Sequence, residues 1–210
     1  LILYMNIVNL TLIISLIIQF LTFILSIDGL SFNLDKKHYV LKEIFILETI
    51  VQAVEAFMYI WIIFAVSNFE QMVQRRYIDW MITTPIMLIN TIVFMDYINT
   101  LSTDNVVSFT NFINDNVYTI LFIVICNACM LLFGYLGETK AINKKVSIFI
   151  GFIFFFIVFY TIYSQYANST LSINLFYFVF IVWALYGVAA LFKPKLKNIC
   201  YNFLDIISKN

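Results

Sequence analysis

The sequence predicts an all-α protein, a single domain of seven transmembrane helices over residues 1–210. The first observation is composition: 63% of the residues are hydrophobic, 11% are charged and the mean hydropathy is +0.96, whereas an ordinary soluble domain is about 45–50% apolar and about 25% charged. The second is that the apolar runs are long and continuous, which favours spanning helices over the alternating strands of a barrel. Because one span needs roughly 20 residues, a chain of this length with short loops accommodates about seven.

The same composition excludes several classes of protein. It does not fit a soluble globular domain or a disordered chain, and five Gly and two Pro exclude collagen-like and linker-rich chains. Lys and Arg (12) balance Asp and Glu (12), so nothing electrostatic favours nucleic acid or another acidic partner. The three cysteines imply no disulfide framework, because Cys126 and Cys129 share one apolar run and Cys200 is distant in sequence.

Helix boundaries follow the polar and turn residues between the apolar runs. The first helix ends at Asp28-Gly29, the fourth ends near Gly137-Glu138, and the sixth ends at Lys193-Pro194. A polar stretch, 99–114, separates the third helix from the fourth. The predicted helices cover residues 4–27, 40–67, 71–98, 115–137, 143–166, 171–192 and 196–210.

The last predicted helix has about 15 residues, which is too few to cross a bilayer at 1.5 Å per residue. We therefore expect the natural protein to continue beyond Asn210.

The loop charges are distributed unevenly between the two ends of the predicted bundle. With an outside N-terminus, the inside loops hold only Lys36, Lys37 and Lys42. The outside loops then hold Arg75, Arg76, Lys140, Lys144, Lys145, Lys193, Lys195 and Lys197. Taken alone, the positive-inside rule would place the N-terminus in the cytoplasm.

Ionisable side chains inside predicted spans are costly, so each is a functional hypothesis. In the third predicted helix, Arg76, Asp79 and Thr83 share one face, which Met87 and Asn90 continue. A buried Asp79 needs a cationic partner, and Arg76, one turn away, is one candidate. The alternative is a structural ion pair near the helix end.

Asp205 and Lys209 lie four residues apart on the last predicted helix. A buried lysine suits Schiff-base formation with an aldehyde. The carboxylates of Asp79 and Asp205 could then balance the positive charge. An internal salt bridge explains the spacing equally well.

The first two predicted helices also carry polar stripes. Glu48, Gln52 and Glu55 share one face of the second, and Ser15 and Gln19 lie four apart on the first. They could line a hydrated path for cations. Hydrogen bonding between helices explains Ser15 and Gln19 well but explains the glutamates poorly.

Aromatic residues make up 19% of the chain, and we expect most of the 23 Phe to pack or to face lipid. Trp80, Trp183 and Tyr186 are better candidates for a ligand cage, because Trp183 and Tyr186 share a face of the sixth predicted helix.

Several of these motifs together resemble the microbial (type 1) rhodopsins. The run Arg76-Tyr77-x-Asp79-Trp80-x-x-Thr83-Thr84-Pro85 resembles their third-helix signature. Asp205-x-x-x-Lys209 resembles their pair of counterion and retinal-bearing lysine, and Trp183-x-x-Tyr186 resembles one wall of their retinal pocket. The pocket positions of the second and fourth helices are matched by Tyr59, Asn127, Met130 and Gly134.

The resemblance implies a pocket at the centre of the bundle that holds all-trans retinal, attached to Lys209 as a protonated Schiff base. Asp79 would be the primary counterion and proton acceptor, Asp205 the second counterion, and Arg76 would organise water. Trp80 and Trp183 would sandwich the polyene, and a hydrogen bond from Asn127 to Thr84 would couple two helices. The other implied pocket residues are Tyr59, Thr83, Met87, Met130, Gly134 and Tyr186.

Departures from the bacteriorhodopsin pattern argue against a fast proton pump. Asn90 stands where that pump has the aspartate that reprotonates the Schiff base. The loop before the last helix has Lys193, Lys195 and Lys197 instead of proton-release glutamates.

Other residues resemble the channel-forming members. Glu55 and Asn210 match the central-gate glutamate and asparagine of channelrhodopsins, and Ser15 would be the third gate residue. Glu48, Gln19 and Asn202 resemble the polar pathway of the viral group 1 rhodopsins, which act as light-gated cation channels. The complete expected pathway is Ser15, Gln19, Glu48, Glu55, Arg76, Asn90, Asn202 and Asn210.

The sequence is therefore interpreted as a light-gated channel for monovalent cations or protons, not an enzyme, with no metal site. We expect a homo-oligomer in a lipid bilayer, with the N-terminus extracellular as in the resembled family. The alternatives are an outward proton pump, a photosensory receptor, and a seven-helix protein without retinal.

Overall fold

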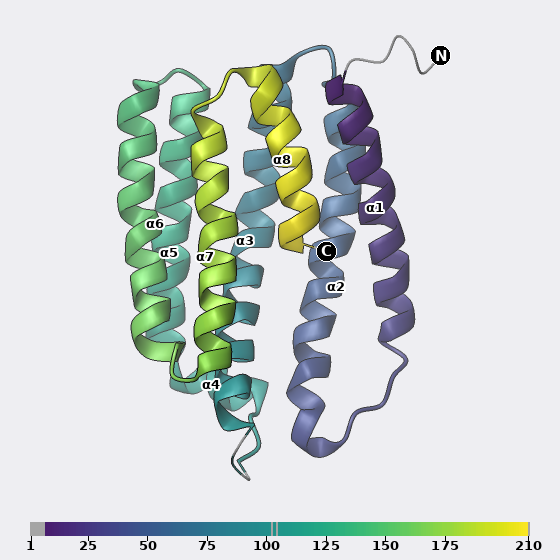
Figure 1. The fold of residues 1–210 in the computed structure, drawn as a ribbon, viewed down its shortest axis with the longest axis vertical. Helices are drawn as coiled ribbons and strands as arrows, with labels where there is room; N and C mark the ends of the chain where they lie inside the picture. The colour runs from purple at the N-terminus through teal and green to yellow at the C-terminus, as the bar shows by residue number, and fades with distance from the viewer. Residues whose placement is uncertain (1–6, 102, 104, 210) are drawn as a thin grey trace.

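The computed structural model describes residues 7–101, 103 and 105–209, which form an up-and-down bundle of helices (Figure 1). The helices are α1 (Ile7–Gly29), the short 3-10 helix η2 (Lys36–His38), α2 (Tyr39–Ile63), α3 (Phe69–Thr100), α4 (Phe109–Asp115), α5 (Val117–Glu138), α6 (Lys144–Tyr166), α7 (Thr170–Ala190) and α8 (Pro194–Lys209). α8 lies between α7 on one side and α1 and α3 on the other.

The predicted seven-helix bundle is confirmed. Six helices of the described part are long and apolar enough to cross a membrane: α1, α2 together with η2, α3, α5, α6 and α7. α8 is the seventh helix of the bundle. It has 16 residues and reaches from one end of the bundle to its middle (Figure 1). The short helix α4 lies at the opposite end.

The structure differs from the predicted boundaries in two places. The polar stretch 99–114, predicted only as a separator of the third and fourth helices, contains most of α4. Ser108 caps this helix by accepting a hydrogen bond from the Asn111 amide, and Phe112 is buried. α2 was expected to reach residue 67 but ends at Ile63. Asn68 then caps α3 by accepting a hydrogen bond from the Gln71 amide.

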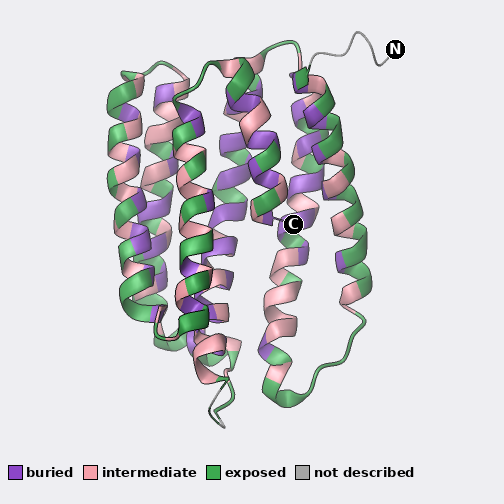
Figure 2. Cartoon of the chain, viewed as in Figure 1, coloured by how far each residue is buried: buried purple, intermediate pink, exposed green. Residues whose placement is uncertain are grey.

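Figure 2 shows which residues of each helix are exposed and which are buried in the bundle. Many of the exposed residues are large and apolar, whereas several ionisable residues are buried. Phe57 is 69% exposed and Phe149 is 67% exposed, whereas Arg76, Glu55 and Asp205 are fully buried. This distribution fits a lipid solvent, in which exposed apolar side chains are favourable and ionisable groups face the bundle interior.

Aromatic packing fills the space between α6 and α7. The rings of Phe155 and Phe159 lie 4.5 Å apart, and Phe180 packs against both, with centroids 5.3 Å and 5.5 Å away. The α6–α7 side of the bundle is therefore packed with aromatic rings. The buried ionisable and polar residues at the centre lie mainly on α1, α2, α3 and α8.

Candidate functional site

Lys209 is the centre of a buried charge cluster. Its ammonium donates to Asp79 Oδ2 at 2.9 Å and to Glu55 Oε2, and it lies 3.7 Å from Asp205 Oδ1. α2, α3 and α8 each supply one of these carboxylates, and the lysine side chain is 2% exposed. The structure brings Asp79 and Asp205 together with Lys209, and it adds Glu55, which the sequence had placed with Ser15 and Asn210.

Arg76 forms the second cationic contact of the cluster. It donates to Asp205 Oδ2 at 2.5 Å, to Tyr59 Oη at 3.0 Å and to Asn202 Oδ1. The suggested pairing of Arg76 with Asp79 is therefore wrong. The long arginine side chain reaches across to α8, while Lys209 takes the Asp79 carboxylate.

The cluster holds more negative than positive charge when every group is ionised. Its carboxylates are Glu55, Asp79 and Asp205, and its cations are Arg76 and Lys209. An uncompensated charge in a buried site is strongly destabilising. With all five groups ionised, the cluster would carry one net negative charge, which an added proton or cation would balance.

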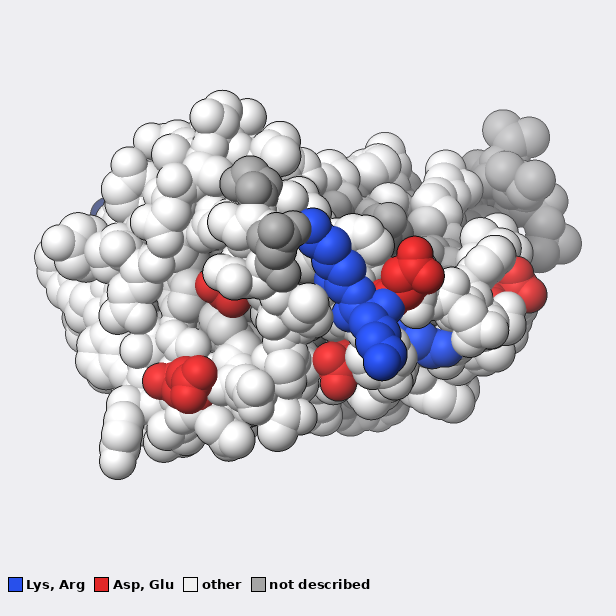
Figure 3. Space-filling view, turned by 90° about the horizontal axis from the view of Figure 1, so that it is seen from below, with Lys and Arg blue, Asp and Glu red and all other residues white. Residues whose placement is uncertain are grey.

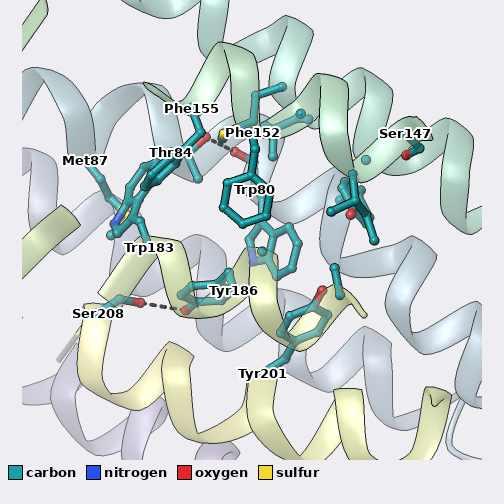
Figure 4. Close-up of a pocket in the computed structure, with 18 of the residues that line it drawn as sticks. Trp80, Thr84, Met87, Ser147, Phe152, Phe155, Trp183, Tyr186, Tyr201 and Ser208 are labelled. Carbon is teal, nitrogen blue, oxygen red and sulfur yellow. Dashed lines mark hydrogen bonds between the residues drawn. The ribbon is translucent and has the colours of Figure 1, made fainter. Parts of the chain in front are cut away.

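An apolar cavity of about 120 Å³ lies beside Lys209 (Figure 4). Trp80, Trp183, Tyr186 and Tyr201 surround the same space, and the rings of Trp80 and Tyr186 meet edge-on at 5.4 Å. The predicted residues that line the cavity are Trp80, Thr84, Met87, Met130, Gly134, Trp183, Tyr186 and Lys209. Tyr186 also donates to Asp205 Oδ1 at 2.8 Å, which joins the cavity wall to the charge cluster.

Five residues predicted for the retinal site lie outside this lining: Tyr59, Asp79, Thr83, Asn127 and Asp205. Asp79 and Asp205 belong to the charge cluster. Tyr59 donates to Asp205 Oδ2 at 2.7 Å and so belongs to the charge cluster. Thr83 donates to the backbone carbonyl of Asp79 at 3.1 Å rather than to its carboxylate. The expected bond between α3 and α5 is present, with Asn127 Nδ2 donating to Thr84 Oγ1 at 2.8 Å.

The cavity also has a wall on α6 that the sequence analysis did not identify. Gly151, Phe152 and Phe155 line it, opposite Gly187 on α7. Ser147 of α6 lines the cavity as well, so Ser147 and Gly151, four residues apart on one helix face, were the signals that the sequence offered.

The expected pathway residues fall into two groups. Around Glu55, Gln19 Nε2 approaches Oε1 at 3.5 Å, and Gln52 donates to the Lys209 carbonyl. Ser15 donates to the backbone carbonyl of Asn202 at 2.8 Å, so it is joined to Asn202 and not to Glu55. Asn210 lies outside the described residues.

The second group lies on the other side of Lys209. Asn90 Nδ2 donates to Glu48 Oε1 at 2.8 Å, between α3 and α2. A second cavity of about 80 Å³ extends from Glu48 to Ser208, the neighbour of Lys209, and is also lined by Met87 and Trp183.

Comparison with known proteins gives the class of the protein. The family model described as "Bacteriorhodopsin-like protein" matches residues 4–210. A crystal structure of the viral rhodopsin OLPVRII is similar, with a TM-score of 0.82, 28% identity, and coverage of 97% of this chain and 92% of that chain. The blue light-absorbing proteorhodopsin from Med12 shares the fold, with a TM-score of 0.75, 19% identity and the same coverage. No curated protein matches the chain.

The protein is thus an integral membrane protein with the fold of the microbial rhodopsins. The chain belongs to the bacteriorhodopsin-like family and resembles a viral rhodopsin. The family implies a retinal chromophore held by a lysine Schiff base. The residues present fit that group, because one buried lysine stands between an aromatic, apolar cavity and a set of carboxylates.

Proposed function

We propose that this protein is a light-gated cation channel that carries all-trans retinal on Lys209. The observation that carries the proposal is the buried charge cluster, which joins Lys209 directly to Glu55 and is short of one positive charge.

The chromophore would be held by residues already described. Lys209 would bear it as a protonated Schiff base, Trp80 and Trp183 would contain it, and Tyr186 would orient the Asp205 carboxylate beside it. When bound, retinal absorbs visible light and changes shape. Asp79 and Asp205 would balance the positive charge on the lysine nitrogen and keep it ionised in a buried site.

The path would run past Glu55 along α1, α2, α3 and α8. Gln19, Asn202 and Ser15 supply buried polar groups to it, and carboxylates favour cations over anions in such a path. Gln52 Oε1 and Asp79 Oδ1 are buried without a hydrogen-bond partner in the described structure, so both can accept from water or coordinate a cation.

Lys209 keeps this path closed by holding Glu55. As a protonated Schiff base, Lys209 would carry a single N–H, which would be shared between Glu55 and Asp79. Transfer of that proton to Asp79, whose Oδ2 lies 2.9 Å from Lys209 Nζ in this structure, would neutralise both groups. Glu55 would then lose its ion pair, and a hydrated cation could replace the missing positive charge. Beyond Lys209, Asn90 and Glu48 would continue the path through the second cavity.

An outward proton pump is the second candidate, because of one specific contact. Asn90 cannot reprotonate the site as an aspartate would, but it holds the Glu48 carboxyl at 2.8 Å. A protonated Glu48 could supply that proton from α2. In either case we propose that the transported species is a monovalent cation or a proton, and that the N-terminus is extracellular in a homo-oligomer.

Photocurrents of Glu55→Gln under voltage clamp test the channel proposal. The substitution removes the negative charge that attracts cations, so we expect the cation current to fall, with the visible absorption band retained. Glu43→Gln, on the same helix but outside the path, should leave the current unchanged. Equal currents in both variants and in the natural protein would contradict the proposal.

A further inference from the structure

The end of the bundle at which α1 begins, uppermost in Figure 1, carries a strong excess of basic side chains. Its basic residues are Arg75, Lys140, Lys144, Lys145, Lys193, Lys195 and Lys197, and its acidic residues in the described chain are Glu70 and Glu138. The lower end presents one group of basic side chains among acidic ones (Figure 3). The basic residues there are only Lys36, Lys37 and Lys42.

Both acidic groups of the upper end are already neutralised. Glu70 pairs with Lys140 at 3.0 Å. Glu138 accepts from the buried Lys197 at 2.5 Å and 2.6 Å, and Lys144 lies 3.9 Å away. Lys197 is 1% exposed, so this pair ties α5 to α8 inside the bundle.

Three lysines of the same end are exposed and remain uncompensated. No ion pair of the described residues joins Lys145, Lys193 or Lys195 to a carboxylate. Lys145 lies on the first turn of α6, Lys193 on the α7–α8 turn and Lys195 on the first turn of α8. These segments are close together, since Lys144 Nζ donates to the Phe192 carbonyl at 3.4 Å. The lysines therefore form one surface, which we call the basic rim: Lys144, Lys145, Lys193 and Lys195.

The basic rim sits at the depth of lipid headgroups. α6 and α7 have 23 and 21 residues, so each spans roughly 30 Å, the thickness of the hydrocarbon layer. Apolar side chains flank the rim on the lipid side: Val146 is 51% exposed, Leu191 57% and Leu196 48%. Ammonium groups above an apolar belt match a molecule with an anionic head and acyl chains.

We propose that the basic rim binds the headgroup of an anionic phospholipid in the leaflet that surrounds the upper end of the bundle. Lysines near an anionic membrane surface each contribute roughly fivefold to binding, so three uncompensated lysines imply a preference for anionic over zwitterionic lipid of at least about tenfold. The site does not depend on retinal or on ion conduction. It also gives a role to the excess of basic residues at the upper end, which are not part of the proposed channel pathway.

Lipid retention and thermal unfolding of the protein in nanodiscs test the proposal. The discs contain phosphatidylcholine alone or mixed with phosphatidylglycerol. We expect phosphatidylglycerol to raise the unfolding temperature and to be retained at least about tenfold over phosphatidylcholine by native mass spectrometry. Both effects should disappear in the triple variant Lys145→Gln, Lys193→Gln, Lys195→Gln and should weaken as salt is raised.

Two controls keep the result interpretable. Lys36→Gln combined with Lys37→Gln removes the same kind of charge from the lower end and should retain the lipid preference. Each single substitution in the rim should give part of the loss, which guards against a triple variant that fails to fold. The proposal is overturned if the triple variant keeps the preference or if the lower-end variant loses it equally. Stabilisation by inorganic phosphate alone in phosphatidylcholine discs, with the same lysine dependence, would identify a free-phosphate site instead and overturn the lipid assignment.

Discussion

At the scale of single residues, Lys209 has closer partners than its sequence neighbourhood indicated. The four-residue spacing pointed to Asp205, which lies 3.7 Å from the ammonium, whereas Asp79 on α3 is at 2.9 Å and Glu55 on α2 also accepts from it. The spacing of residues along one helix predicts contacts within that helix, but it does not predict which other helices pack against it. The contact with Glu55 therefore needed the three-dimensional arrangement of α2 and α8.

The lysine assignment makes a spectroscopic prediction. Among the described residues that line the cavity, Lys209 is the one with an amine, so no visible absorption band should form in Lys209→Ala when retinal is added. Lys195→Ala removes an exposed amine of the same helix and should leave the band intact. A band that survives in Lys209→Ala would contradict the proposed attachment.

The Arg76–Asp205 pair makes a prediction about stability. Arg76→Gln leaves Asp205 buried without its closest cation, which is expected to lower the free energy of unfolding by about 3–5 kcal/mol. Lys140→Gln breaks an exposed pair with Glu70 and should cost no more than about 1 kcal/mol. Thermal unfolding of the two variants in the same lipid measures the two losses of stability. Equal losses would contradict the prediction that the buried pair stabilises the protein more than the exposed pair.

At the scale of helices, the long apolar runs predicted every helix that is long enough to span the membrane. The first and last residues of the helices were predicted less well. α4 was missed because its stability depends on one buried aromatic, Phe112, and one cap, Ser108, rather than on a repeated apolar pattern. The α6 wall of the cavity was missed for a related reason, since an unbroken apolar run does not show which face meets a ligand.

Close packing of α5 on α6 gives a prediction at this scale. A Cβ added at Gly137 would lie 2.6 Å from Ser147 Cβ, so Gly137→Ala should separate the helices and cost about 1–3 kcal/mol. A Cβ added at Gly151 would meet only the Met130 carbonyl oxygen, at 3.7 Å, among the described residues. Gly151→Ala should then be neutral, or stabilising by up to about 1 kcal/mol through helix propensity. Equal destabilisation of both variants in thermal unfolding would refute this packing argument.

At the scale of the whole molecule, the position of the charged residues is more informative than the net charge. The net charge of zero says little, yet Glu55, Asp79, Asp205, Arg76 and Lys209 form one cluster inside an apolar shell. The sequence predicted the class of fold and most of these residues, because ionisable groups in apolar helices are conspicuous. It could not predict their pairing, since Arg76 and Lys209 each had more than one carboxylate within reach.

The reversal potential of the photocurrent tests the central claim most directly. With the natural protein under voltage clamp, a channel lets cations follow their gradient, so the light-induced current should change sign near the cation equilibrium potential and should shift when the external monovalent cation is diluted. A current that keeps one direction at every voltage and survives without a gradient would contradict the channel and would identify a pump.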